Sequence, residues 1–89
     1  MIIDVQHECE NGWHVFTSPH VPGLFLTGQQ DDLEELYDEI PHVICALARA
    51  DFGQDVVVEP VQTYLQYVEG LPDGFKPGVK HFSIQKIAA

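Results

Sequence analysis

Basic residues are scarce in this chain. It has 4 Lys and Arg residues against 14 Asp and Glu residues among 89, which gives a formal net charge of −10. A surface with this balance repels phosphate backbones and anionic lipid. The composition therefore argues against direct binding to nucleic acid or to a membrane. It suits a basic protein partner, or solubility alone, and the charge balance does not choose between these two.

Cysteines and long apolar runs are scarce as well. The 2 cysteines, Cys9 and Cys45, form neither a disulfide framework nor a zinc-binding pattern. No run approaches the roughly 18 consecutive apolar residues of a membrane span. Asp4 and Glu8 interrupt any apolar stretch at the N-terminus, which therefore does not resemble a signal peptide. We expect a reduced, cytoplasmic protein.

The first part of the chain predicts three strands. In Met1–Glu8, Ile3, Val5 and His7 alternate with Ile2, Asp4 and Gln6, which is typical of a strand with one buried face. Trp13–Ser18 is predicted as a second strand, with Trp13, Val15 and Thr17 on one face and His14, Phe16 and Ser18 on the other. Asn11-Gly12 between them tolerates the positive φ angles of a tight hairpin turn. The Pro/Gly-containing corner Pro19–Gly23 then leads to Leu24–Thr27, whose continuous apolar character predicts a central strand covered on both faces.

A long amphipathic helix is predicted from Leu33 to Ala50. Asp32 fits the N-cap, with Glu35 at the capping-box spacing, and Gly53 suits a left-handed cap at the other end. Pro41 should bend the helix without ending it. The apolar stripe consists of Leu33, Leu36, Ile40, Val43, Ile44 and Leu47. The opposite face carries Glu34, Asp38, His42, Cys45 and Arg49.

The remaining residues predict one more helix or strand between two strands. Val56–Glu59 is typical of a strand, and Pro60 places its end at a sheet edge. In Val61–Val68 the apolar spacing favours a helix, whereas the β-branched and aromatic content would suit a strand. Gly70–Gly78 predicts a loop, and Val79–Ile87 a last strand. The whole pattern predicts an α+β domain with a small, mainly antiparallel sheet, one long covering helix and a C-terminal extension.

No catalytic, cofactor-binding or metal-binding set stands out. The five histidines do not have the spacing of a zinc motif. Asp4 would need carboxylates from the helix to hold a divalent cation, but the helix acids point away from the apolar stripe. Cys45 beside His42 lacks an oxyanion-type glycine turn. We therefore expect a binding module and no enzyme.

The order of motifs resembles the HicB antitoxin family. An aromatic–Val–x–Thr–Ser segment, a Val-Pro-Gly-Leu corner and an Asp-Leu-Glu-Glu-Leu helix start occur at Trp13–Ser18, Val21–Leu24 and Asp32–Leu36. The resemblance covers residues 1–59 and leaves residues 60–89 as an extension of the same domain. It implies a truncated RNase-H-like fold with β-β-β-α-β order. It also implies a non-enzymatic partner that neutralises a small basic mRNA-cleaving toxin, HicA.

One feature of that family is missing from the sequence. Full-length HicB antitoxins usually carry a DNA-binding segment after this domain. Residues 60–89 contain only Lys76, Lys80 and Lys86 as basic residues and have no helix-turn-helix or ribbon-helix-helix pattern. We therefore expect no operator binding by this chain. The alternatives are an orphan HicB-like regulatory or structural protein and, from another class, a metal-dependent enzyme.

The partner surface is predicted to combine apolar and acidic side chains. The candidate residues are Trp13, Phe16, Phe25, Glu34, Asp38 and His42. The aromatic residues would supply apolar contact if their faces are exposed, and the acidic residues would attract a basic partner. A homodimer is also expected, by pairing of strand edges or by helix packing.

Overall fold

A computed structural model describes residues 1–71 and 76–88 and has an α+β architecture. The strands are β1 (Ile2–Glu10), β2 (Trp13–Thr17), β3 (Phe25–Gln29), β4 (Val57–Pro60) and β5 (Val79–Ala88). The helices are a 3₁₀ turn η1 (Gln30–Asp32), the long α1 (Leu33–Phe52) and the short α2 (Tyr64–Glu69).

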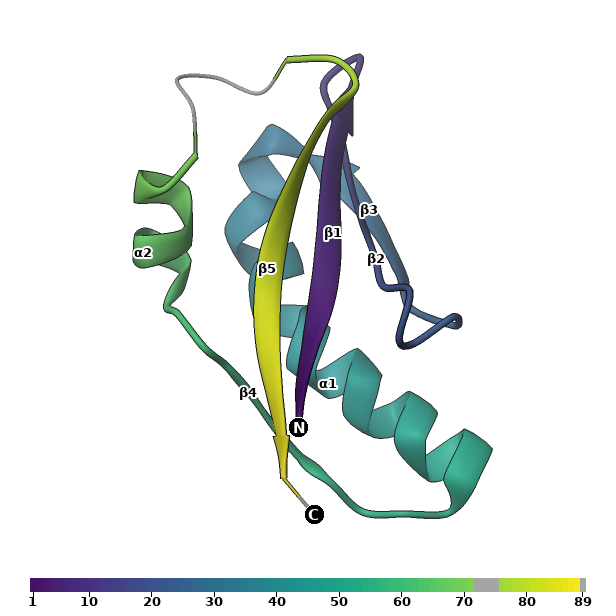
Figure 1. Cartoon of the computed structure of the whole chain (residues 1–89). Coiled ribbons are helices and arrows are strands. Elements are labelled where there is room, and N and C mark those ends of the chain that lie inside the picture. Colours follow the sequence, from purple (N-terminus) through teal and green to yellow (C-terminus); the bar gives the residue numbers. More distant parts are fainter. Residues whose placement is uncertain (72–75, 89) are drawn as a thin grey trace.

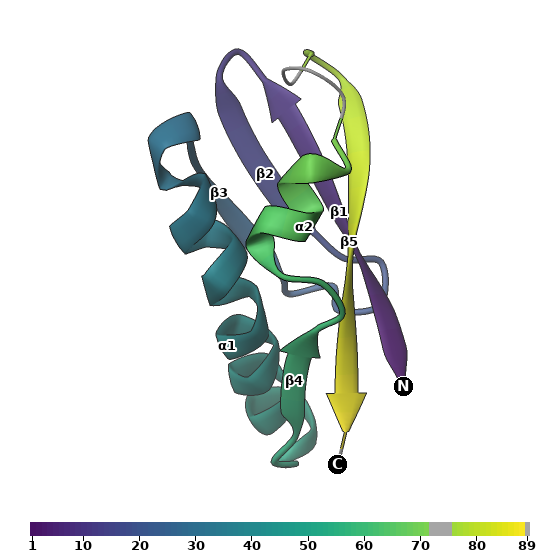
Figure 2. The same cartoon turned by 90° about the vertical axis from the view of Figure 1, so that its left-hand side faces the viewer.

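The five strands form one antiparallel sheet in the order β3-β2-β1-β5-β4. The sheet is curled, and α1 and α2 lie side by side on one of its faces (Figures 1 and 2). Among the described residues, no helix covers the other face. The two sides of the molecule are therefore different: one is a helical surface, and the other is a bare sheet.

The β1–β2 hairpin agrees with the sequence prediction. Asn11 and Gly12 both have positive φ, 53° and 79°, as a two-residue turn matching the strand twist requires. Ile3, Val5 and His7 of β1 point inward and are buried. The residues between them point to the bare face. The sequence therefore predicted both strands and the turn between them correctly.

The prediction of a central, doubly covered third strand is wrong. β3 lies at the edge of the sheet and pairs only with β2 among the described strands. Leu24 is buried but precedes the strand, and Phe25 is 64% exposed on the bare face. Leu26, which is half-buried, faces α1. The three residues of this apolar run therefore lie in three different environments: the core, the solvent and the side that faces α1. Composition alone does not predict this difference.

Helix α1 runs without interruption from Leu33 through Pro41 to Phe52 and ends at Gly53, whose φ of 65° is left-handed as predicted. The predicted capping box at its start is wrong. Asp32 precedes the helix but makes no side-chain cap hydrogen bond. Its ψ of 1° belongs to the 3₁₀ turn η1, whereas a capping side chain needs extended backbone at that residue.

The stripe of α1 that faces the sheet is close to the predicted one. Leu33, Ile40 and Ile44 are buried in the core. Leu36, Val43 and Leu47 are half-buried beside them. Tyr37, which the predicted stripe omitted, is buried as well and donates a hydrogen bond of 2.7 Å from its hydroxyl to the Gln62 carbonyl.

Residues 61–68 contain most of α2, the helix that their apolar spacing favoured. Thr63 caps α2 with a reciprocal capping box to Gln66. Tyr67 is the buried residue, whereas Leu65 is 71% exposed. The predicted loop Gly70–Gly78 falls partly outside the described residues.

The C-terminal extension is an integral part of the sheet. β5 lies between β1 and β4 and pairs with β1 along most of its length, from Ile2–Lys86 to Cys9–Val79. β4 is an edge strand, as Pro60 predicted. On β5 the polar Ser83 and Gln85 point into the protein, whereas apolar side chains face outward.

Candidate functional site

A chain of hydrogen bonds runs through the protein between the sheet and α2. The Tyr67 hydroxyl lies 2.7 Å from Nδ1 of His7, and Nε2 of His7 lies 2.8 Å from Nδ1 of His14. Nε2 of His14 lies 2.7 Å from Oε1 of Gln30. The Phe16 ring stacks on His7 with ring centroids 4.3 Å apart. We call Tyr67, His7, His14 and Gln30, which these hydrogen bonds connect, the histidine chain.

The chain has one consistent set of protons when both histidines are neutral. The Gln30 carbonyl oxygen accepts, so Nε2 of His14 donates and its Nδ1 accepts. Nε2 of His7 then donates to His14, which leaves Nδ1 of His7 to accept from the Tyr67 hydroxyl. A proton added to either ring would turn an accepting nitrogen into a donor. The geometry therefore favours two uncharged rings.

Burial also favours the uncharged form of both histidines. Removal from water, followed by the neighbouring His14 and His81 rings, lowers the pKa of His7 to about 3. Burial also lowers the pKa of His14, against a smaller raising effect of the Gln30 hydrogen bond. Burial raises the pKa of Tyr67 as well. All three groups are neutral near pH 7.

The three rings of the histidine chain are sealed from solvent, whereas Gln30 at its end is exposed. His7, His14 and Tyr67 are 0%, 1% and 2% exposed. A general acid or base must reach the proton that it transfers, directly or through one water. In this conformation, no substrate can reach the rings. Their evident effect is structural, because they hold β1, β2, α2 and the η1 turn together.

Metal-binding geometry is not found in the described part of the chain, where no group of three or more His, Cys, Asp or Glu side chains could hold an ion. His20 lies apart from the histidine chain and accepts a hydrogen bond of 3.1 Å from the Asp4 backbone amide. Cys45 is half-buried, and its thiol lies 3.4 Å from the Val56 carbonyl oxygen.

The outer surface of η1 and the first half of α1 is strongly acidic. Six exposed carboxylates gather there, and we call them the acidic helix surface: Asp31, Asp32, Glu34, Glu35, Asp38 and Glu39. In residues 1–71 and 76–88 the two ion pairs are Arg49–Asp55 and Lys80–Glu8, so neither involves this surface. Glu34 and Asp38 also add to the effect of burial in raising the pKa of Tyr64, which places α2 within their field.

The predicted partner residues separate into groups on opposite sides of the molecule. Glu34, Asp38 and His42 are exposed together on α1. Trp13 and Phe25 are exposed on the bare face of the sheet. Phe16 points inward and is 0% exposed, so it supports the histidine chain and offers no contact to a partner.

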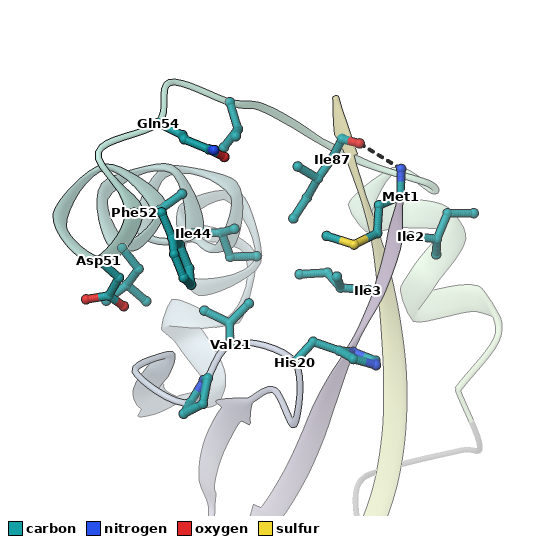
Figure 3. Close-up of a pocket in the computed structure, with 14 residues that line it drawn as sticks. Met1, Ile2, Ile3, His20, Val21, Ile44, Asp51, Phe52, Gln54 and Ile87 are labelled. Atoms are coloured by element: carbon teal, nitrogen blue, oxygen red, sulfur yellow. Dashed lines mark hydrogen bonds between the residues drawn. The ribbon is translucent and has the colours of Figure 1, made fainter. Parts of the chain in front are cut away.

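An apolar groove of about 840 Å³ opens between the N-terminal end of β1 and the last turns of α1. Figure 3 shows Ile3, Ile44 and Val21 around it, with Phe52 at the rim and the Met1 amino group hydrogen-bonded to the Ile87 carbonyl. The polar side chains at its border, His20, Asp51 and Gln54, come from separate segments. They do not form a shared polar cluster that would select a ligand.

No family model matches this chain, and neither does any curated protein or solved structure. In the part of the chain that the structure describes, no helix is long and apolar enough to cross a membrane.

Sequence reasoning did not predict the histidine chain. The sequence grouped His7 with Ile3 and Val5 on one face of β1, and the hairpin turn set His7 and His14 on adjacent strands. That signal could have predicted their contact. The contribution of Tyr67 could not be predicted, because the buried side of α2 depends on how this short helix packs against the sheet.

Proposed function

We propose that this chain is a non-enzymatic protein-binding module that neutralises a small basic mRNA-cleaving toxin, as its resemblance to HicB antitoxins implies. The observation that carries the proposal is the acidic helix surface. Its six carboxylates are exposed, without an ion pair among the described residues, and close to the helix N-terminus. A basic protein is the partner that such a field attracts and orients.

Apolar contact on the same side would come from α2. Leu65 is 71% exposed there, and Val68 is 36% exposed. A partner that covers both helices would combine an apolar patch with an acidic border, which is the usual anatomy of a protein interface. This surface replaces the predicted combination with Trp13 and Phe25, since those residues lie on the other side of the sheet.

The fold and the absence of catalysis are part of the same proposal. The succession β1-β2-β3-α1-β4 supports a truncated RNase-H-like core, to which the extension adds α2 and β5. The rings of the histidine chain are buried and out of reach of a substrate, which supports a function other than catalysis. Metal analysis of tag-free protein tests this part, because stoichiometric metal would indicate the enzyme alternative.

Co-expression provides the direct test. The chain would be produced together with the product of a small basic reading frame beside its gene and purified at low salt. We expect a stable complex and relief of growth arrest. A lack of complex would overturn the antitoxin proposal and favour a regulatory or structural protein without a toxin.

A charge-reversal variant would locate the interface. Glu34→Lys/Asp38→Lys should weaken the complex about tenfold or more, because two favourable charges become repulsive. Asp51→Lys/Asp55→Lys makes the same change in net charge at exposed positions outside both the acidic helix surface and the bare face and serves as the control. Equal losses in both variants would indicate general attraction without a defined binding surface.

A further inference from the structure

The bare face of the sheet, which no described helix covers, carries several large apolar side chains that are exposed. Phe82 of β5 is 55% exposed and Ile84 is 36% exposed, whereas their neighbours Ser83 and Gln85 are 0% exposed. Successive side chains of a strand point to opposite faces, so residues 82–85 of this strand turn their polar side chains inward and their apolar side chains outward. The same face carries Trp13 (48% exposed), Phe25 (64%) and Ile2 (61%).

The charges on this face differ from those on the rest of the chain. The outward-facing charged residues of β1, β4 and β5 are Asp4, Glu8, Glu10, Glu59, Lys80 and Lys86. Two of the chain's 4 basic residues are therefore here, beside four acidic ones, which gives a local charge of −2. The remaining −8 of the −10 lies elsewhere. The bare face is therefore less repulsive toward a second copy than the acidic helix surface is.

One pair of opposite charges lies across the neighbouring strands β1 and β5. Glu8 on β1 stands directly opposite Lys80 on β5, and their charged groups are 3.1 Å apart. A twofold axis that runs along the strands between β1 and β5 would place β1 of each copy over β5 of the other. Glu8 would then face Lys80 of the second copy, and the four charges would form one closed cluster.

From these observations we propose that two copies of this chain associate through the bare faces of their sheets, with β1 of each copy over β5 of the other. The association is independent of the proposed toxin partner. It is an aligned face-to-face sheet packing, not a pairing of strand edges or a contact between helices. The acidic helix surfaces of the two copies then point away from each other.

The area available fits a modest dimer. An aromatic side chain buries about 150–250 Å². At their present exposure, Trp13 and Phe82 together would remove about 150–260 Å² of ring surface per copy, whereas Phe25 on the edge strand β3 lies outside the overlap of the two sheets. A stable interface buries about 800 Å² per partner, so Ile2, Ile84 and the polar side chains between them must supply the rest. The dimer should therefore dissociate on dilution.

Two single charge reversals and their mixture test the geometry. Glu8→Lys alone would place four positive charges in the central cluster, and Lys80→Glu alone would place four negative ones. Each variant should therefore be monomeric by light scattering at concentrations where the native protein, with a chain mass of 10.0 kDa, is dimeric. In an equimolar mixture, each lysine pair of one variant faces a glutamate pair of the other, so the mixture should recover the dimer mass.

Matched controls keep the test specific. Arg49→Glu changes the net charge from −10 to −12, as Lys80→Glu does, but Arg49 is on α1. Glu39→Lys matches Glu8→Lys in the same way, also on α1. Both controls should remain dimeric. A monomeric native protein at all concentrations, a native mass in either single variant, or a mixture that stays monomeric would each overturn the proposal.

Discussion

At the residue scale, His7 is the most constrained side chain in the protein. Its ring nitrogens contact Tyr67 and His14, its face stacks on Phe16, and it is fully buried. The strands β1 and β2 and the helix α2 therefore meet at this residue. The histidine chain therefore couples stability to pH, although it has no access to a substrate.

The pH dependence has a definite sign. In the unfolded chain His7 takes up a proton near its ordinary pKa of 6.5, whereas in the folded protein its pKa is about 3. Between these values unfolding binds a proton, so the free energy of unfolding falls as the pH falls. Above pH 6.5 this contribution is fully present. The slope per proton is about 1.4 kcal/mol per pH unit.

Replacement of His7 by leucine should remove this slope. Urea unfolding of the native protein and of His7→Leu, measured across mildly acidic pH, should give curves whose slopes differ by about 1.4 kcal/mol per pH unit. The variant should also be less stable near pH 7, because it leaves the hydroxyl of Tyr67 and Nδ1 of His14 without their partner. Parallel pH curves would contradict the assignment of the slope to His7.

Tyr67→Phe tests the other end of the contact. The substitution keeps the ring but leaves Nδ1 of His7 without its 2.7 Å donor in a buried site. We expect a loss of about 1–3 kcal/mol in the free energy of unfolding. Tyr64→Phe removes a hydroxyl from a half-buried tyrosine of the same helix and should cost less. Equal losses would indicate that the buried hydrogen bond contributes nothing specific.

At the scale of elements, the two helices begin in different ways, and this difference is measurable. Thr63 caps α2 with its side chain, whereas Asp32 makes no such bond to α1. Thr63→Ala should therefore cost about 1 kcal/mol, and hydrogen exchange should speed up mainly in α2. Asp32→Ala should cost only the smaller electrostatic contribution of about 0.3–1 kcal/mol. The reverse order of losses would contradict the observed caps.

Local patterns were sufficient for most elements and insufficient for their arrangement. Alternation and the Asn11-Gly12 turn predicted the first hairpin, and apolar spacing predicted α1, because both signals arise within a few residues. The edge position of β3 and the central position of β5 depend on long-range pairing, which local sequence does not encode. β5 is the clearest case, since its Phe82 and Ile84 face outward while Ser83 and Gln85 are buried.

The candidate partner surface, like the fold, could be predicted from the sequence only in part. The exposed carboxylates of α1 were predictable, because a helix with one apolar stripe turns its opposite side to solvent. Grouping them with Trp13 and Phe25 required knowledge of which side of the sheet the helix covers. Phe16 shows the limit of composition most directly, since its alternate position on β2 makes it a core residue.

At the scale of the whole molecule, the two sides offer different chemistry. The helical side has six exposed carboxylates, and the bare sheet has exposed aromatic rings and a nearly balanced charge. Self-association through the sheet would leave both acidic helix surfaces accessible. The dimer would then present two separate binding surfaces to a basic partner.

Salt should affect the two associations differently. Partner binding to the acidic helix surface depends on exposed charges and should weaken as ionic strength rises. Self-association depends more on apolar burial and should change less. Calorimetric titration with the co-purified basic partner and light scattering of the chain alone, at low and high salt, would compare the two. A dimer that dissociates in salt while partner binding persists would contradict this division.

The most direct measurement is the mass of the complex between this chain and its co-purified basic partner, determined by light scattering at low salt and at a concentration where the chain alone is dimeric. With separate surfaces for the two associations, the complex should contain two copies of the chain and two copies of the partner. A complex of one copy each would contradict the account, because the partner would then have displaced the second copy from the sheet. A failure to form any complex would contradict the proposed function itself.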